Sequence, residues 1–368
     1  MLAPGGGLTG LVSYLQAWRD MDVPLDVTVY ASRQPVLDAV EAADPKSTAL
    51  PFCVNENRLR FFWLRHRKLG RMIDQSGAQV VLPTNSLAGE TTTPQIVHHQ
   101  NLNCFTPFNF KEELQAGGLQ QALKSYGIRK AGQKALKESA ANLFISDYMR
   151  KLAEQFSPES ISRNSVVHNG VTPELLESAS KPHTWQKSPT ISAVTSDNPH
   201  KDNPTLIRMF GELCRQAPET PWQLKVAGRG SYAAEKQLAE ELGVADRIHW
   251  LGFLSVDSME DLFRESLCLV FTSAVEGFGN PPLEAMARSC PVVASDATAI
   301  PEVCGNAALL VPVGDASGFA DAVLKYWCQP QLREEKVVLG RKRILEFKWS
   351  NSAEKMYRVI CDVAGPPQ

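Results

Sequence analysis

TSAVEGFGNPPLEAMA, residues 272–287, runs from the end of a predicted strand into the start of a predicted helix. The apolar run CLVFTS (268–273) that leads into it is typical of a buried strand. Asn280 suits the N-cap of the helix, and Pro281 suits its first position, where a missing N–H loses no hydrogen bond. Free N–H groups and the positive helix end then form an anion site at the carboxyl end of a parallel strand, where open α/β sheets bind ligands.

Two carboxylates flank this predicted anion site. Glu276 lies in the loop and Glu284 lies one turn into the helix, in E-x7-E spacing. The spacing places one beside the reacting part of a ligand and the other deeper along its nucleoside. Acids at a helix N-terminus are common for electrostatic reasons alone. Their combination with Gly277 and Gly279, which let a bulky ligand approach the backbone, favours a binding site.

Short β-branched runs alternate with longer segments of helical period, which is typical of parallel α/β units. Strands are predicted at 25–30, 79–83, 95–99, 142–146 and 165–168, and then at 190–195, 222–227, 247–252, 268–273 and 291–295. Helices are predicted near 9–20, 56–75, 119–138, 147–155, 203–216, 231–243, 257–266, 281–289, 316–328 and 351–364.

The alternation breaks in PELLESASKPHTWQKSP (173–189), which is rich in Pro and Ser. We therefore predict an α/β fold with two Rossmann-like, doubly wound parallel-sheet domains, residues 1–172 and 173–348, facing a cleft. The last segment, 349–368, is expected to form a helix that packs back on the first domain. Only MLAP precedes the Gly5–Gly7 turn, so either the first domain lacks its leading strand or the chain starts late.

Composition excludes several classes of protein. The hydrophobic fraction of 43% and the charged fraction of 21% describe a folded globular protein. The net charge is −2 and the sequence has no known motif for nucleic-acid recognition, so there is no support for a nucleic-acid partner. The 8 cysteines show no CxxC pair, and no uncharged apolar run is long enough to span a membrane. We expect a cytoplasmic protein, attached at most peripherally to the inner face of the cytoplasmic membrane.

EGFGNPPLEAMA resembles the E-x7-E signature of family 4 glycosyltransferases, the group 1 glycosyl transferases, which are retaining enzymes with the GT-B fold. The likeness extends through VVHNGV (166–171), AGRG (227–230), LGFL (251–254) and SDATAIPEVCGNAALLVPVGD (295–315), which follow the family's order. The resemblance covers most of the chain and is strongest from about residue 140 to 325. It is specific for the family and says little about the substrate.

The resemblance implies roles for particular residues. Glu276 would contact hydroxyls of the transferred sugar and help stabilise its cationic transition state, and Glu284 would accept hydrogen bonds from the donor ribose. Lys201, in SDNPHKDN, matches the family's phosphate lysine, which stabilises the leaving diphosphate. Backbone amides from Asn280 to Leu283 would hold that diphosphate. The donor-binding set implied in this stretch is Gly277, Phe278, Gly279, Asn280, Pro281, Pro282, Leu283 and Glu284.

One departure from the family concerns the leaving group. The family usually places an Arg about five residues before the lysine, where this chain has Thr195 and Ser196. Either stabilisation of the leaving group is weaker, or another cation substitutes. Arg229, next to Gly228 in the AGRG loop at the end of a neighbouring strand, is our candidate for that cation.

In the first domain, Gly5–Gly7 and Gly10 resemble the family's glycine-rich loop that faces the donor phosphate, and Gly6 and Gly7 are the donor-binding residues expected there. His98 and His99 close a strand whose carboxyl end should face the cleft, and the family often has a functional His there. Strand alternation points only one of the two inward, and the sequence leaves open which. An ordinary polar strand end would give the same pattern.

No metal or other cofactor is expected. Asp20-Met21-Asp22 is a D-x-D string, but it lies at a predicted helix end far from any glycine loop, so solvated acids explain it. This agrees with GT-B enzymes, which use helix dipoles and cations in place of a divalent metal.

A basic and aromatic segment, NRLRFFWLRHRKLGRMI (57–73), predicts either a membrane-surface helix or an amphipathic helix that buries its aromatic residues in the core. A second basic cluster supports the membrane hypothesis: Lys124, Arg129, Lys130, Lys134 and Lys137. In that case an anionic membrane surface would be a partner, and the acceptor would be a lipid-linked sugar.

The favoured hypothesis is a metal-independent, retaining hexosyltransferase. It would move a sugar from a nucleotide-sugar donor to a saccharide or lipid-linked saccharide in cell-envelope polysaccharide synthesis, such as lipopolysaccharide O-antigen, capsule or exopolysaccharide. One alternative is a sugar-nucleotide epimerase of the same fold, against which the E-x7-E pair argues. Another is a non-catalytic protein that binds nucleotide sugars. The sugar, the base and the linkage are not encoded in any diagnostic residue.

Overall fold

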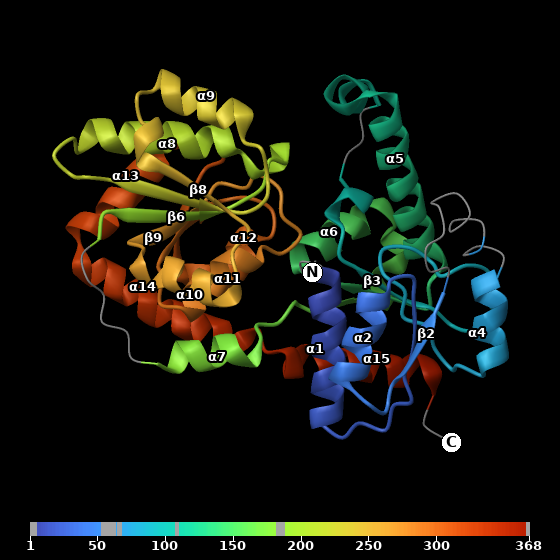
Figure 1. The fold of residues 1–368 in the computed structure, drawn as a ribbon. Coiled ribbons are helices and arrows are strands. Elements are labelled where there is room, and N and C mark those ends of the chain that lie inside the picture. Colours follow the sequence, from blue (N-terminus) through green and yellow to red (C-terminus); the bar gives the residue numbers. More distant parts are fainter. Residues whose placement is uncertain (1–5, 53–63, 65–67, 107–109, 182–187, 366–368) are drawn as a thin grey trace. The chain divides into compact units, whose positions relative to one another are not determined.

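The computed structural model describes residues 6–52, 64, 68–106, 110–181 and 188–365, without the side chains of residues 6, 7 and 110–117. The chain divides into two compact units, the first formed by residues 1–170 with 348–368 and the second by 171–347 (Figure 1). Each unit is an α/β structure with parallel strands. The two units are described separately.

The second unit contains a six-stranded parallel sheet in the order β11-β10-β9-β6-β7-β8. Its strands are β6 (Thr190–Val194), β7 (Gln223–Ala227), β8 (Ile248–Gly252), β9 (Cys268–Phe271), β10 (Val292–Ser295) and β11 (Ala308–Val311). The chain builds outward from β6 through β7 and β8, and then returns to place β9 on the other side of β6. The strand order therefore reverses between β6 and β9, and in such sheets the crevice at the carboxyl ends of the two central strands receives the ligand.

Helices cover both faces of this sheet. They are α7 (Pro173–Ser180), α8 (Asn203–Gln216), α9 (Ala233–Glu241), α10 (Val256–Glu265), α11 (Asn280–Ala287), α12 (Ile300–Cys304), α13 (Ala316–Cys328) and α14 (Pro330–Arg343). Helices α8, α9 and α13 form one layer, and α7, α11 and α14 pack together in the other (Figure 1).

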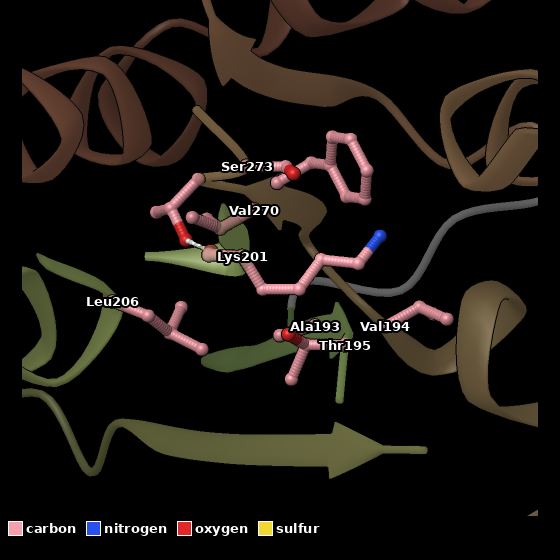
Figure 2. Close-up of a pocket in the computed structure, with 9 residues that line it drawn as sticks. Ala193, Val194, Thr195, Lys201, Leu206, Val270 and Ser273 are labelled. Carbon is pink, nitrogen blue, oxygen red and sulfur yellow. Dashed lines mark hydrogen bonds between the residues drawn. The ribbon is translucent and has the colours of Figure 1, made fainter. Parts of the chain in front are cut away.

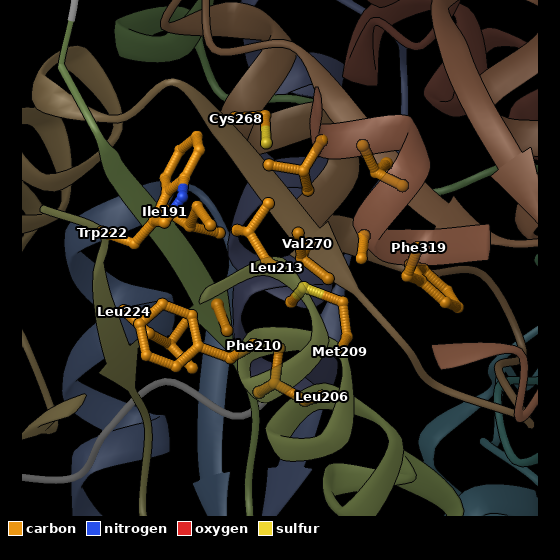
Figure 3. Packing of buried hydrophobic residues seen from close by; sticks show 14 of the residues in the cluster. Ile191, Leu206, Met209, Phe210, Leu213, Trp222, Leu224, Cys268, Val270 and Phe319 are labelled. Carbon is orange, nitrogen blue, oxygen red and sulfur yellow. The ribbon is translucent and has the colours of Figure 1, made fainter. Parts of the chain in front are cut away.

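The core of the second unit lies under α8 and α13. Met209, Phe210 and Leu213 of α8 project from one side of the helix and meet Trp222 and Phe319, all of them fully buried (Figure 3). Their spacing of three to four residues explains why this segment forms an amphipathic helix. Each such side chain contributes about 1.5–3 kcal/mol to folding on removal from water, so the sheet that carries the site is firmly supported.

The first unit has its parallel strands in two groups. Strand β1 (Thr28–Ala31) pairs with β2 (Thr48–Pro51), and β3 (Ile96–His99), β4 (Ala141–Phe144) and β5 (Asn164–Val166) form the other group. Its helices are α1 (Gly6–Asp20), α2 (Gln34–Ala43), α4 (Gly70–Ser76), α5 (Phe110–Glu138), α6 (Asp147–Phe156) and α15 (Trp349–Ala364). Helix α1 packs against α2 and α15 (Figure 1).

Helix α15 joins the first unit through a cluster of large side chains. Trp18 of α1 donates its indole N–H to the carbonyl of Ala353 at 3.0 Å, and Tyr14 meets Trp349 edge-on with ring centroids 5.0 Å apart. Gly170 lies under Trp349 so closely that a Cβ there would be 2.5 Å from the indole ring. The end of the chain is therefore built into the core that α1 and α15 share.

Several predicted elements differ from those observed. Among the described residues, the predicted strand 79–83 makes one isolated parallel bridge, Val81 with Gln95, and Thr84 just after it makes another with His98. The sequence does not predict strands β2 and β11 or helices α2, α7, α12 and α14, and α7 occupies the start of the expected linker. Helix α1 begins at Gly6, so Gly6 and Gly7 form its first turn and do not lie in a loop before it.

Candidate active site

The loop that follows β9 leads into α11 through a glycine. Gly279 is the N-cap, with φ 93°, and a Cβ on it would lie 2.5 Å from Ile300 Cδ1. The prediction that Asn280 is the N-cap is therefore wrong, because Asn280 is already the first helical residue. Only glycine combines this left-handed backbone with the close approach of Ile300.

The first turn of α11 offers fewer N–H groups than predicted. Pro281 and Pro282 carry no N–H, so the prediction that every residue from Asn280 to Leu283 offers an amide is wrong at two positions. Asn280 and Leu283 retain theirs. The side chains of Phe278, Pro282 and Leu283 are buried, and Phe278 packs edge-on against Phe347 at 5.6 Å. A ligand at this turn would meet backbone and not these side chains.

Lys201 and Glu276 are joined by an ion pair at the point where the strand order reverses. Lys201 Nζ lies 2.6 Å from Glu276 Oε1, and the side chains are only 18% and 15% exposed. Lys201 follows β6 and Glu276 follows β9, which are neighbouring strands. The sheet therefore brings together two residues that the sequence assigned separately.

The backbone around Lys201 is held to the end of β9. Thr272 donates its hydroxyl to the carbonyls of Lys201 and Asp202 at 3.0 and 3.1 Å, and Ser273 donates to the carbonyl of His200 at 3.1 Å. The backbone N–H of Ala274 also donates to the His200 carbonyl, at 2.8 Å. These bonds fix the position of the lysine side chain relative to the loop that carries Glu276.

Thr298 holds Glu276 from the other side. Its hydroxyl accepts a hydrogen bond from the Glu276 backbone N–H at 3.0 Å, and Thr298 itself has φ 51°. Sequence reasoning gave no role to Thr272, Ser273 or Thr298. In the sequence, the indication of such roles is that residues with hydroxyl groups lie at the ends of β9 and β10.

A small pocket with a cavity volume of about 10 Å³ lies beside the lysine. In Figure 2 the Lys201 side chain extends across it, with Thr195 on one side and Ser273 on the other. The ammonium group also lies 5.4 Å from the centre of the Phe271 ring. A charge on an apolar wall acts more strongly on a bound anion than one in water would.

The position of the missing Arg is filled by a hydrogen-bonded turn. Thr195 donates its hydroxyl to Asn203 Oδ1 at 2.6 Å, and Asn203 Nδ2 donates to the carbonyl of Ser196 at 2.8 Å. Asn203 begins α8, so these bonds tie the end of β6 to the next helix. They supply no positive charge.

The AGRG loop lies directly beside this turn. Gly228 has φ 133°, and a Cβ on it would lie 1.7 Å from the carbonyl oxygen of Thr195, so no other residue fits. Arg229 is exposed, and its guanidinium lies 4.9 Å from the centre of the Phe253 ring. No ion pair is formed by Arg229 with any residue that the structure describes.

Glu284 lies on α11 with its carboxyl group largely desolvated. Burial raises its pKa above the ordinary value, and the charge of Arg288, one turn later, opposes that rise. Within the described residues, no side chain or backbone group donates a hydrogen bond to this carboxylate. Its oxygens are available to accept hydrogen bonds from a ligand.

His98 and His99 are both buried, on opposite faces of β3. His98 packs edge-on against Tyr14 of α1 and has Gln100 Nε2 3.2 Å from its Nδ1. His99 stacks on Phe144 at 4.9 Å and bonds Asn142 through Nε2 at 2.9 Å.

Burial lowers both histidine pKa values, to about 3 for His98 and about 4 for His99. Both imidazoles are therefore neutral near neutral pH. The structure separates their neighbours, which the sequence could not: His98 belongs with α1, and His99 with the aromatic side chains of Phe105 and Phe144.

The predicted basic surface is only partly within the described residues. Of the segment 57–73, residues 57–63 and 65–67 lie outside them, and α4 begins at Gly70. Lys124, Lys130, Lys134 and Lys137 are exposed on α5. Arg129 is not part of this surface, because it is buried and donates to the carbonyl and hydroxyl of Thr106 at 2.7 and 3.0 Å.

The described residues contain neither a membrane-spanning helix nor a cluster of metal ligands. None of the helices in the described ranges is both long enough and apolar enough to cross a bilayer. Across the same ranges, three or more His, Cys, Asp or Glu side chains do not come together as a metal site.

Comparison with known proteins places these features in a family. Residues 188–329 match the family described as "Glycosyl transferases group 1". The chain is 25% identical to the phosphatidyl-myo-inositol mannosyltransferase of Mycolicibacterium smegmatis, over 98% of this chain and 91% of that protein. It is 36% identical to the O-antigen chain mannosyltransferase RfbU of Salmonella typhimurium, over 38% of each chain.

The fold is also found in solved structures. WaaG, a glycosyltransferase involved in lipopolysaccharide biosynthesis, superposes with a TM-score of 0.68 at 16% identity, over 99% of this chain and 97% of that one. The family match falls on the unit that carries Lys201, Glu276 and α11. The second unit therefore matches the group 1 glycosyl transferases, and the chain has the GT-B fold.

Proposed function

We propose that this protein is a retaining hexosyltransferase that uses a nucleotide-sugar donor without a metal ion. The observation that carries the proposal is the Lys201–Glu276 pair, 2.6 Å apart beside the N-terminus of α11. A cation, a carboxylate and a helix N-terminus at one strand edge match a donor whose diphosphate is negative and whose reacting sugar becomes positive.

In this proposal, each residue stabilises the part of the donor whose charge is opposite to its own. The amides of Asn280 and Leu283 hold the diphosphate, and Lys201 stabilises the charge that develops on it as the bond from the anomeric carbon to the phosphate oxygen breaks. Glu276 contacts the sugar hydroxyls and stabilises the positive charge on the ring. The acceptor oxygen then bonds the anomeric carbon on the same face and gives its proton to the departing diphosphate, so the products are the nucleoside diphosphate and an α-linked glycoside.

Glu284 recognises the nucleoside in this proposal. Its carboxylate accepts hydrogen bonds from the ribose hydroxyls, which agrees with the lack of a donor to that carboxylate among the described residues. Arg229, exposed next to Gly228, supplies the second cation for the diphosphate. Gly6 and Gly7, in the first turn of α1, and His98 belong to the acceptor-side unit.

The acceptor we propose is a saccharide or lipid-linked saccharide of the cell envelope. The mannosyltransferases of phosphatidyl-myo-inositol and of O-antigen among the relatives support this class. Helix α5 provides a surface for a membrane-held acceptor, because Leu119, Leu123 and Tyr126 are 58, 55 and 47% exposed beside its lysines. Apolar side chains with adjacent cations suit an anionic membrane surface, which supports our proposal of peripheral attachment at the cytoplasmic face.

The test is nucleoside diphosphate release from a panel of GDP-, UDP-, ADP- and dTDP-sugars, with and without EDTA and acceptor extracts. Wild type is compared with Glu276→Ala, and Glu240→Ala on the exposed surface of α9 serves as the matched control. EDTA-resistant release that only Glu276→Ala abolishes supports the proposal. Conversion of the donor into an epimer, or binding without release in the presence of acceptor, would contradict it.

A further inference from the structure

Arg288 is a buried arginine at the end of the helix that carries Glu284. It is the C-cap of α11 and is 5% exposed. Its Nη1 donates to the backbone carbonyl of Glu284 at 3.1 Å, and its guanidinium lies 5.6 Å from the centre of the Phe263 ring. A charged group buried to this extent is destabilising unless it has a charged partner.

The partner of Arg288 is Glu260 on α10. Arg288 Nε donates to Glu260 Oε2 at 2.8 Å. The other oxygen of Glu260 accepts from Ser178 of α7 at 2.8 Å and from Arg264 at 2.5 Å. One carboxylate therefore ties three helices together at the base of α11.

This network acts on Glu284 through both position and charge. The hydrogen bond from Arg288 fixes the last turn of α11, which carries the Glu284 carbonyl. The positive charge of Arg288 also opposes the effect of burial on the neighbouring carboxyl group. Replacing a buried pair with apolar residues is often neutral for stability, so stability alone does not explain this arginine.

We propose that Arg288, held by Glu260, is a positioning residue for Glu284 that keeps its carboxylate ionised and oriented for the donor ribose. The inference deepens the proposed function and depends on it only through the role of Glu284 as a donor contact. Arg288 itself does not touch the donor.

Two other arginines near α11 have their own partners. Arg341 of α14 donates to Ser289 and to the carbonyl of Lys181, and Arg343 donates to the carbonyls of Val303 and Glu302 and to Glu346. The remaining ionisable residues on the elements that pack against α11, or directly after them, are Glu174, Glu177, Lys181, Cys268, Glu302, Cys304, Arg333, Glu334, Glu335, Lys336, Lys342 and Glu346. Arg288 is the charge that acts on Glu284.

The experiment measures donor KM and kcat between about pH 5 and pH 8, with the donor identified by the panel above. In Arg288→Met we expect about a tenfold rise in donor KM near neutral pH, with kcat changed much less. The pH below which KM rises should move up by about one unit. Arg288→Lys should restore most of the profile, because it keeps the charge.

Two further variants separate charge from packing. In a Glu284→Gln background, Arg288→Met should no longer move the pH profile, because no carboxyl group remains to titrate. Arg341→Met, which alters a neighbouring arginine on α14, should leave the profile in place. If Arg288→Met fails to fold, Glu260→Gln tests the same coupling with Arg288 still present. The arginine charge is then uncompensated, so the pH below which KM rises should move down, opposite to the shift expected for Arg288→Met.

Failure of this inference can be distinguished from failure of the proposed function. A KM increase in Arg288→Met that is equal at every pH, or that persists unchanged in the Glu284→Gln background, overturns the inference about Arg288. If Glu284→Gln binds the donor as wild type does, the ribose contact in the proposed function is wrong, whatever Arg288 does.

Discussion

Lys201 Nζ and Glu276 Oε1 lie 2.6 Å apart, although the two residues are separated by 75 positions in the chain. They meet because β6 and β9 are adjacent at the point where the strand order reverses. In this geometry each of these groups neutralises the other. In the proposed function, a phosphate of the donor competes with the Glu276 carboxylate for the lysine.

Glu276→Gln should separate product binding from catalysis. Removing the carboxylate frees Lys201 for the diphosphate, so the affinity for the nucleoside diphosphate should rise several-fold. Turnover should fall by about 10²-fold or more, because stabilisation of the sugar cation is lost. Calorimetric titration with the diphosphate and steady-state turnover measure the two effects. Weaker product binding would show that Glu276 does not restrain the lysine.

Lys201→Met should lower kcat by about 10²–10³-fold, since a cation that stabilises the leaving group in the transition state is removed. Lys201→Arg should retain more activity, because the charge remains. Arg229→Ala tests the second cation and should lower kcat or raise donor KM by a smaller factor. An Arg229→Ala enzyme with unchanged kinetics would remove Arg229 from the site.

Gly228→Ala should strongly destabilise the second unit. The added Cβ would lie 1.7 Å from the Thr195 carbonyl oxygen, at φ 133°. We expect a loss of more than about 2 kcal/mol in the free energy of unfolding, together with weaker donor binding. Gly243→Ala is the matched control: its φ is 67° and nothing lies within 4 Å of the new Cβ, so only the backbone cost of about 1 kcal/mol is expected. Equal losses in the two variants would contradict the close contact.

The buried histidines should make the stability of the protein depend on pH. Their folded pKa values, lowered by burial to about 3 for His98 and about 4 for His99, lie below the ordinary value of 6.5. The unfolded chain therefore binds protons first. The free energy of unfolding should be fully retained above about pH 6.5 and should fall as the pH decreases towards about 4.

Denaturant unfolding at several pH values measures this decrease. The contribution of His99 alone is on the order of 3 kcal/mol. His99→Phe should flatten part of the pH dependence, whereas His249→Phe on the exposed edge of β8 should not. A profile that His99→Phe leaves unchanged would rule out a buried neutral imidazole.

Vesicle binding tests the α5 surface. The wild-type protein should float with anionic vesicles at low salt and dissociate as salt rises, because surface charge is screened. Reversing Lys124 and Lys130 to Glu should abolish flotation, since each basic residue contributes about 1 kcal/mol. Reversing Lys236 and Lys325 in the second unit is the control. Binding that persists after the α5 reversal would assign the membrane contact elsewhere.

Local sequence patterns predict an element correctly where the residues of that element alone determine its structure. The apolar runs at 190–195, 222–227 and 268–273 became β6, β7 and β9, since buried parallel strands are continuous apolar segments. Strand β2, TALP, was missed because it is short and mostly exposed, and its pairing with β1 defines it. For helix α7, PELLESAS, the Pro and Ser content predicts a linker, although Pro173 suits a helix start.

The sequence by itself determined the α/β class, the E-x7-E helix and the separate presence of Lys201, because period, capping and motif spacing are local properties. Tertiary structure alone decided that Lys201 bonds Glu276, that His98 and His99 enter different environments, and that Arg288 is held by Glu260. These relationships depend on which strands become neighbours and which helix faces meet. The interaction energies that decide this act between segments far apart in the chain, so a pattern within one segment does not predict them.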